Sequence, residues 1–567
     1  MIKQLDVDGV PTLLAPTTGP MHAGLVFRVG QADETLARKG VTHLVEHLAL
    51  HSIGTADYHY NGVTGVEHTY FHMRGSAEEI TGFLTGVCAT LRSLPVQRLE
   101  VEKEILRTER NSRGSGVAEP LMVWRHGARD FGLPAYPEWG LPALTAEDLR
   151  EWVAGYFTRD NAALWIAGDE IPAGLRLDLP AGVRRQAPRA SSALPVTPAW
   201  FPGSSPVVAW DAVVPHSAAA ASFTKVLERR MFRELRQQAG LSYSAHTDYD
   251  LRSDGTAVIS AVADALPAKQ GAVLGGFVDL LAALRVGRID QDEVASVVHQ
   301  ACEASREADA TGARLPGQVF RLLAGRPVLD VEETVAQIRA VTRDDVAAVA
   351  SQAYDAGLLM TPGGTGADWA GYAPAPAGSE HAVQGTRYPA AHRPEYAVVT
   401  GEDGVSAIAR DDIATVRYDA CAAVLAWPDG GRRLFGHDGV VVTVEPTMYR
   451  NGAAAVPGID ARIPDGLRVD LPPRDPEDIP QPPQLTARAR WRRTFAWWHT
   501  ARAAKTRLVL PYAALALLNV AVVAGVIGAQ VYQQRPRILS VIPIAFCGTY
   551  AVRYARRAYA AFRAFRD

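Results

Sequence analysis

The first 360 residues alternate short apolar runs with longer segments in which apolar positions have helical spacing. Residues 10–14 and 24–30 are predicted strands, and the second of them is almost continuously apolar. Residues 77–94 and 146–156 place apolar side chains three and four positions apart, which predicts helices that bury one face. This mixture of strands and helices predicts an α+β fold.

The region from about residue 195 to residue 360 repeats the same design. Its predicted elements are a strand over 206–214, a long helix over 217–238, a strand-like segment over 251–263, and helices over 268–284 and 291–308. We therefore expect two tandem α/β halves, 1–188 and 195–360.

The composition changes after residue 360. Residues 361–394 are rich in Gly, Pro and Ala and predict a flexible linker. Short β-type runs separated by turns predict a small antiparallel β domain over 395–470, weakly similar to pleckstrin-homology-like domains of bacterial membrane proteins. A docking module and a plain spacer or dimerisation unit both fit this domain. Residues 471–486 form a second, Pro-rich linker.

The C-terminal region has the pattern of a membrane anchor. Residues 487–507 mix arginines with tryptophans, and 508–532 carry no charge over a length that can span a bilayer. A shorter apolar run over 538–552 follows, and arginines flank the pair of runs on both outer sides. By the positive-inside rule both ends face the cytoplasm. The sequence thus predicts a transmembrane hairpin and basic tail over 508–567, in a two-span protein of the cytoplasmic membrane that contacts the lipid bilayer.

Composition narrows the possibilities further. A chain of 567 residues is too long for one core, and a formal net charge of -3 gives no general attraction to nucleic acid. The cysteines are widely spaced, without a C-x-x-C pair, which fits a reducing compartment and argues against cysteine-ligated zinc. They are Cys88, Cys302, Cys421 and Cys547. The N-terminus has no apolar core of a signal peptide.

The strongest chemical signal is the pattern H-x-x-E-H formed by His43, Glu46 and His47. Successive residues of a helix advance by about 100°, so the two histidines lie about 40° apart on one face. Two neutral imidazoles can hold one divalent metal, and a neighbouring glutamate can take a proton from a water molecule there. A polar helix can also show this pattern by chance, so the motif alone leaves both interpretations open.

A second helical stretch, 99–110, carries Glu102 and Glu109 seven positions apart and therefore on one face. A solvated charged face would show the same spacing. Combined with the H-x-x-E-H motif, however, the spacing E-x6-E resembles the insulinase/pitrilysin (M16) metallopeptidases. This resemblance implies one zinc ion per chain held by His43, His47 and Glu109. It also implies Glu46 as the general base and Glu102 as a support of the ligands.

Two weaker similarities to the same family concern substrate. Asn61 lies in a segment similar to one that lines the substrate cleft, although the insertion that usually precedes it is shortened here. Residues 232–244 are similar to the signature R-x5-[SAG]-Y, which implies that Arg236 and Tyr243 reach the substrate. A helix C-terminus followed by Gly240 explains that segment equally well. His68 and His72 are expected to be ordinary strand residues rather than further ligands.

The resemblance implies that the halves form a clam-like chamber and that the chain is an endopeptidase acting on peptides or small unfolded polypeptides. Homodimers or heterodimers are common in this family, and no nucleic-acid partner is expected. The competing hypothesis is a catalytically silent M16-like scaffold that serves assembly at a membrane. The presence of all three implied ligands and of Glu46 favours the enzyme.

Overall fold

The computed structural model describes residues 2–482, except residues 52–58, 113–115, 394 and 465. The chain divides after Gln481 into two units, and every helix and strand that is described belongs to the first unit.

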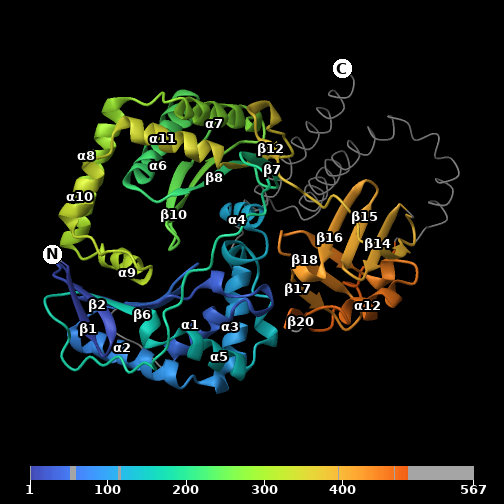
Figure 1. Ribbon diagram of the computed structural model, residues 1–567, viewed down its shortest axis with the longest axis horizontal. Coiled ribbons are helices and arrows are strands. Elements are labelled where there is room, and N and C mark those ends of the chain that lie inside the picture. Colours follow the sequence, from blue (N-terminus) through green and yellow to red (C-terminus); the bar gives the residue numbers. More distant parts are fainter. Residues whose placement is uncertain (1, 52–58, 113–115, 394, 465, 483–567) are drawn as a thin grey trace, which may run out of the picture. The chain divides into compact units, whose positions relative to one another are not determined.

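The first half is built on a six-stranded sheet with the order β1-β2-β6-β3-β5-β4 (Figure 1). All neighbouring strands are antiparallel except β2 and β6, which are parallel. The central strands β2, β3 and β6 are buried almost throughout, as apolar runs predict. The strands are β1 (Lys3–Val7), β2 (Val10–Ala15), β3 (His22–Phe27), β4 (Tyr60–Thr64), β5 (Thr69–Arg74) and β6 (Ala162–Ala167).

Helices cover both faces of this sheet. Side chains of α1, α2 and α5 form one core with Leu25 and Phe27 of β3. The alternate residue Val26 faces the other way and packs with Leu315 and Val319 of α9, which comes from the second half (Figure 1). The helices of the first half are α1 (Val41–His51), α2 (Ala77–Arg92), α3 (Leu99–Ser112), α4 (Ala118–His126) and α5 (Ala146–Tyr156).

Five strands of the second half repeat the first in a sheet of order β12-β7-β11-β8-β10-β9, with β7 and β11 parallel as β2 and β6 are. The edge strand β12 differs from β1, since it follows the other strands in sequence and pairs in parallel with β7. The shared order of these five strands agrees with the expected α/β content of both halves. Its strands are β7 (Ala199–Gly203), β8 (Val207–Pro215), β9 (Ala245–Leu251), β10 (Thr256–Asp264), β11 (Leu358–Pro362) and β12 (Ala373–Pro374). Its helices are α6 (Ala218–Met231), the π-helix η7 (Phe232–Gln238), α7 (Gln270–Arg285), α8 (Gln291–Ala310), α9 (Leu315–Leu323), α10 (Val331–Arg339) and α11 (Arg343–Asp355).

The β domain consists of two four-stranded sheets, β13-β14-β15-β16 and β19-β18-β17-β20. The prediction of a purely antiparallel domain is wrong at one place, because β20 pairs in parallel with β17. The chain reaches β20 through α12 (Val456–Asp460), and a helical crossover returns a strand in the parallel direction. The strands are β13 (Gly385–Pro389), β14 (Tyr396–Gly401), β15 (Gly404–Ala409), β16 (Asp412–Arg417), β17 (Cys421–Ala426), β18 (Arg432–Gly436), β19 (Val441–Val444) and β20 (Arg468–Asp470).

The two predicted linkers are more ordered than their composition indicates. Residues 361–394 contain β12 and β13, and Tyr372 is buried against Tyr354. In the Pro-rich segment, Arg474 forms ion pairs with Asp429 and Glu445 of the β domain. Composition counts the Gly and Pro residues but not these long-range contacts, so the prediction of a flexible linker is wrong for the parts of 361–394 that form β12 and β13.

The membrane prediction is corrected. Among the described residues, no helix combines the length and the apolar character needed to cross a bilayer. This finding contradicts the predicted two-span protein of the cytoplasmic membrane and leaves the lipid bilayer without support as a partner. The runs 508–532 and 538–552 and the basic segment 487–507, on which that prediction rested, lie outside the described residues.

Candidate metal centre

Helix α1 begins at a buried acidic cap that fixes its position. Glu34 accepts hydrogen bonds from the backbone N–H groups of Gly40 (3.1 Å) and Thr42 (2.9 Å). A carboxylate at this end stabilises a helix because it faces the positive end of the helix dipole. Burial raises the pKa of Glu34, and the charge of nearby Lys39 opposes that shift. The start of α1 is therefore fixed by hydrogen bonds to Glu34 in the preceding segment.

The helix presents His43 and His47 on one face, with ring centres 4.9 Å apart. Helix α3 brings Glu109 to them: its carboxylate oxygens lie 3.9 Å from Nε2 of His43 and 3.5 Å from Nε2 of His47. One ligand atom from each of the three residues lies within 4.8 Å of the others, and both imidazoles are largely buried. Among the described residues, these three form the cluster whose donors can share one ion.

These donors fit zinc. Two ligand atoms placed tetrahedrally at about 2.0–2.1 Å from a zinc ion lie about 3.4 Å apart, comparable with the 3.9 Å between Nε2 of His43 and one carboxylate oxygen of Glu109 and the 3.5 Å between Nε2 of His47 and the other. Two imidazoles and one carboxylate also leave a fourth position open, which is the arrangement of catalytic rather than structural zinc sites.

The other nitrogen of each imidazole faces a carboxylate. Nδ1 of His47 lies 3.4 Å from Glu102, and Nδ1 of His43 lies 2.8 Å from Glu138. Because an ionised carboxylate only accepts hydrogen bonds, each Nδ1 carries the proton and each Nε2 lone pair is directed to the shared position. Burial lowers the pKa of His43, but the hydrogen bond and the negative charges around it outweigh burial and raise the pKa.

The sequence did not indicate Glu138. It lies in irregular chain between α4 and α5, outside any periodic segment, and 95 positions from His43. Glu102, for which the resemblance implies a supporting role, lies 3.4 Å from Nδ1 of His47.

Glu46 lies beside the shared position with its carboxylate buried. Its carboxylate oxygen is 3.9 Å from Nε2 of His43 and accepts a hydrogen bond from the hydroxyl of Thr64 at 3.2 Å. Burial raises the pKa of Glu46, while the two imidazoles oppose the shift. A buried carboxyl with a raised pKa is suited to exchanging protons near neutral pH.

The cluster opens into a cavity of about 880 Å³ that Asn61, on edge strand β4, also lines. A second cavity of about 410 Å³ shares Val63 with the first. Both halves of the chain line the second cavity, for example through Phe131 from the first half and Phe320 from the second.

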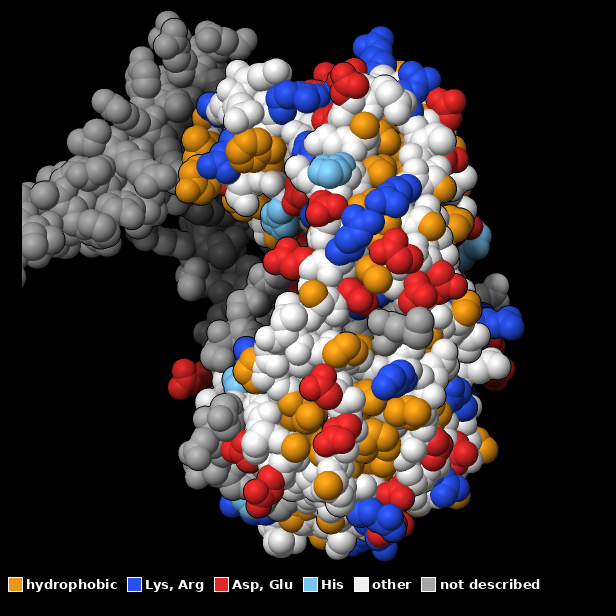
Figure 2. Space-filling view, turned by 90° about the vertical axis from the view of Figure 1, so that its left-hand side faces the viewer, with side chains coloured by type: hydrophobic (Ala, Val, Ile, Leu, Met, Phe, Trp, Pro, Cys, Tyr) orange, Lys and Arg blue, Asp and Glu red, His pale blue; other side chains and the backbone are white. Residues whose placement is uncertain are grey.

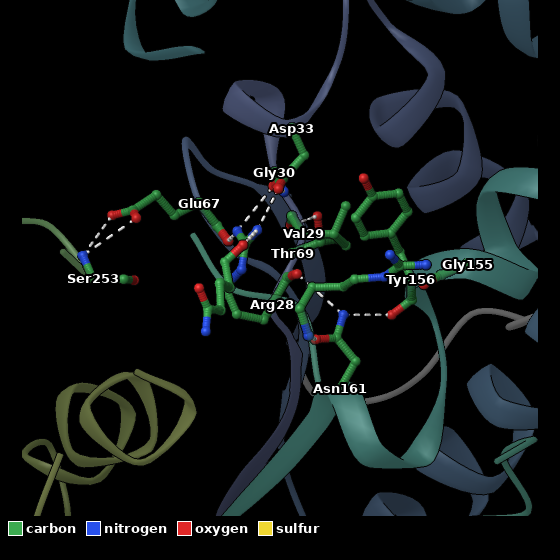
Figure 3. Close-up of polar contacts among 12 residues, drawn as sticks. Arg28, Val29, Gly30, Asp33, Glu67, Thr69, Gly155, Tyr156, Asn161 and Ser253 are labelled. Carbon is green, nitrogen blue, oxygen red and sulfur yellow. Dashed lines mark hydrogen bonds and ion pairs between the residues drawn. The ribbon is translucent and has the colours of Figure 1, made fainter. Parts of the chain in front are cut away.

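Buried polar contacts join the halves around the second cavity. Arg125 of α4 donates to Asp211 of β8 at 2.9 Å, and the next residue, His126, accepts from Arg252 at 2.9 Å. On another wall, Glu67 accepts from the backbone N–H of Ser253 (Figure 3). The backbone carbonyl of Glu67 in turn receives the buried guanidinium of Arg28, which also pairs with Asp33 (Figure 3).

The remaining predicted residues lie elsewhere. Arg236 stands 5.1 Å from the ring centre of Tyr243, whose side chain is 78% exposed, and neither residue lines the metal cavity. Gly240 has a φ of +56°, as expected for a glycine that ends a helix. His72 lies in β5, and His68 stacks on Phe320, so neither belongs to the metal cluster.

Comparison with known proteins shows which solved structures have a similar fold. No protein-family model matches the sequence, and no curated protein matches it. Solved structures do match. A protease from Helicobacter pylori is 16% identical, with 64% of this chain and 99% of that chain covered and a TM-score of 0.55. An inactive M16 peptidase domain from Pseudomonas fluorescens is 15% identical, with 66% and 100% covered and a TM-score of 0.54.

A chain of complex III2 from Candida albicans is 14% identical, with 64% of this chain and 96% of that chain covered and a TM-score of 0.53. Identities this low show the fold and not the activity. These structures each cover about two-thirds of the chain, and over that part the chain has an M16-like peptidase fold.

Proposed function

We propose that this chain is a zinc metalloendopeptidase that hydrolyses peptides or small unfolded polypeptides. The observation that carries the proposal is the convergence of His43, His47 and Glu109 on one position, with Glu46 beside it in a single cavity. Each part alone has an ordinary structural explanation, but together they form the constellation of a hydrolytic zinc site.

Each residue of the site has its own role in the proposed reaction. His43, His47 and Glu109 would hold the ion, which supplies acidification of a water molecule and polarisation of a peptide carbonyl when bound. Glu46 takes the proton from the attacking water and returns it to the leaving amine. Glu102 and Glu138 accept from Nδ1 of the two imidazoles, which would leave each Nε2 lone pair available to hold the ion.

The surroundings favour a peptide as substrate. The metal cavity of about 880 Å³ adjoins a second one of about 410 Å³, so an extended chain of several residues has room on one side of the cluster. Asn61 lies on β4, which is an edge strand, and an edge strand is where an extended peptide can add to a sheet. On the face shown in Figure 2, acidic and basic side chains are interspersed, as suits a chain with a net charge of -3.

The second candidate is a catalytically silent scaffold with the same fold. Two of the three similar structures above favour it, since one is described as inactive and another belongs to complex III2. The exposure of Tyr243 and the position of Arg236 outside the metal cavity also favour it, because no residue of the second half then lines that cavity. Both candidates have the same fold and differ in chemistry.

The test uses the purified full chain and a library of quenched fluorescent peptides. We expect cleavage that disappears after treatment with a chelator and returns on addition of one equivalent of zinc. A folded chain that binds one zinc ion per molecule and cleaves no peptide would support the scaffold. A folded chain that binds no zinc would reject the enzyme.

A further inference from the structure

The β domain packs directly on the chain that supports the metal centre. Phe435 of β18 is 1% exposed, and its ring centre lies 4.6 Å from that of Trp139 and 6.1 Å from that of Tyr136. Both aromatic residues belong to segment 127–143 of the first half and lie between the 3-10 helices η4 (Asp130–Ala135) and η5 (Leu141–Ala143). Leu133 of this segment shares a buried core with Ala423 of β17, so the contact continues beyond the three rings.

Backbone atoms of the two parts also meet closely. The N–H of Ala128 donates to the carbonyl of His437, in the turn that follows β18, at 3.1 Å. Gly127 has a φ of +71°, and a Cβ atom there would lie 2.0 Å from the same carbonyl oxygen. A side chain at position 127 would therefore separate the turn from the segment. Contacts this close are typical of a fixed packing arrangement rather than of a tethered, independent module.

The segment 127–143, which contacts the β domain, contains Glu138. Tyr136 and Trp139, the two residues held by Phe435, stand on either side of it in the sequence. Gly140, two residues after Glu138, lies so close to the chain before α1 that a Cβ atom would be 2.6 Å from the carbonyl oxygen of Ala37. Glu138 thus lies in a segment that contacts both the β domain and the chain just before α1, and a Cβ atom at Gly40 would lie 3.0 Å from Cβ of Glu138. From that position its carboxylate reaches Nδ1 of His43 at 2.8 Å.

We propose that the β domain is a built-in support of the metal centre, with Phe435 as a positioning residue. Through Tyr136 and Trp139 it fixes Glu138, and Glu138 fixes the orientation and tautomer of His43. Loss of a carboxylate that orients a metal-binding histidine typically weakens metal affinity by about 10- to 100-fold. The inference rests on the proposed function, because the bond between Glu138 and His43 has this consequence only if His43 binds the ion.

The test measures zinc affinity of the full chain by competition with a chelating dye, independently of any cleavage. We expect Glu138→Gln to weaken zinc binding about 10- to 100-fold and Phe435→Ala about tenfold. Because both changes act through the same carboxylate, the double variant should bind zinc no more weakly than Glu138→Gln alone. Phe435→Leu, which keeps most of the apolar volume, should fall between wild type and Phe435→Ala.

Val398→Ala is the matched control, since Val398 is fully buried in the β domain but lies in the other sheet. It should lower the thermal midpoint and leave zinc affinity within about twofold of wild type. If Phe435→Ala does not fold, Phe435→Leu carries the comparison and must weaken zinc binding more than Val398→Ala does.

The possible failures are distinguishable. A wild-type chain that binds no zinc removes the proposed function and this inference together. A wild-type chain that binds zinc, with Glu138→Gln weakened and both Phe435 variants unchanged, overturns the supporting role of the β domain alone. Additive losses in the double variant would also overturn it, because they would show that Phe435 acts by another route.

Discussion

At the scale of single residues, the site depends on a glycine that leaves room for Glu46 as well as on its charged groups. Glu46 occupies room that exists because residue 62 is a glycine: a Cβ atom there would lie 2.5 Å from the carboxylate oxygen and 2.8 Å from Cγ of Glu46. Neither atom can move far, since Glu46 is buried and its carboxylate accepts from Thr64. Gly62 is therefore required for the position of the proposed base.

Replacing Gly62 with alanine should displace Glu46 without touching the ligands. We expect cleavage to fall by about 10- to 100-fold, because small displacements of a catalytic group have effects of this size. Zinc content should stay at the wild-type level. Gly82→Ala on α2 is the control, since a Cβ atom there meets nothing within 4 Å and alanine favours helix. Unchanged cleavage in Gly62→Ala would show that the position of Glu46 does not matter.

Sequence reasoning identified the part of the site that lies on helices. His43 and His47, and likewise Glu102 and Glu109, are brought together by helical periodicity, which is a local property. Glu138 and Gly62 act across tertiary contacts, with Glu138 in irregular chain and Gly62 on an edge strand. Nothing in their local sequence distinguishes them, so packing alone reveals their roles.

At the scale of elements, helix α4 links the two halves through its last turn. His126 is 3% exposed, donates through Nδ1 to the carbonyl of Ser191 and accepts from Arg252 through Nε2. Both nitrogens of the neutral ring are thereby satisfied. If the ring took up a second proton, that proton would lie on Nε2 and face the guanidinium of Arg252. Burial, followed by the charge of Arg252, lowers the pKa of His126 to about 3 from its ordinary value of 6.5.

This shift predicts a loss of stability in acid. The unfolded chain takes up the proton near pH 6.5 and the folded chain near pH 3, so the unfolded state binds more protons between these values. The stability that the neutral ring contributes is complete above pH 6.5 and is lost as the pH falls toward 3. One proton corresponds to a slope of at most about 1.4 kcal/mol per pH unit.

Urea unfolding of wild type and His126→Gln between pH 4 and 7 measures this effect. The variant should have a lower free energy of unfolding than wild type at pH 7, and this difference between the two proteins should become smaller as the pH falls. Parallel stability curves would mean that His126 is not held neutral in the folded chain.

Element patterns were predicted well where burial follows a simple period. The apolar runs of β3 and β8 and the amphipathic helices α2 and α5 lie within a few residues of the predicted ranges. The prediction failed where non-local contacts decide structure. The predicted long helix over 217–238 is helical as α6 and η7, but its last seven residues are π-helix, and the strand-like segment predicted over 251–263 takes in the last residue of β9 and the turn before β10.

At the scale of the whole described unit, the halves are joined by a buried ion pair rather than by apolar packing alone. Arg125 and Asp211 are 6% and 5% exposed, and Arg125 also donates to the carbonyls of Asp211 and Ala356. Removing one partner of such a pair leaves the other charge buried without compensation, which costs about 3–5 kcal/mol.

Asp211→Ala should therefore lower the free energy of unfolding by about 3–5 kcal/mol, as measured by urea denaturation. The matched control is Glu303→Ala, which removes the exposed pair between Glu303 and Arg306 on α8 and should change stability by less than about 1 kcal/mol. Similar small losses in both variants would show that the pair does not join the halves energetically.

The central claim is that one cluster binds zinc while Glu46, which is not a ligand, performs the proton transfer. The most direct measurement compares zinc content and peptide cleavage in wild type and Glu46→Gln, both as full chains. The account predicts about one zinc ion per chain in both proteins and cleavage in wild type only. Loss of zinc together with cleavage in Glu46→Gln, or cleavage that survives the substitution, would contradict it.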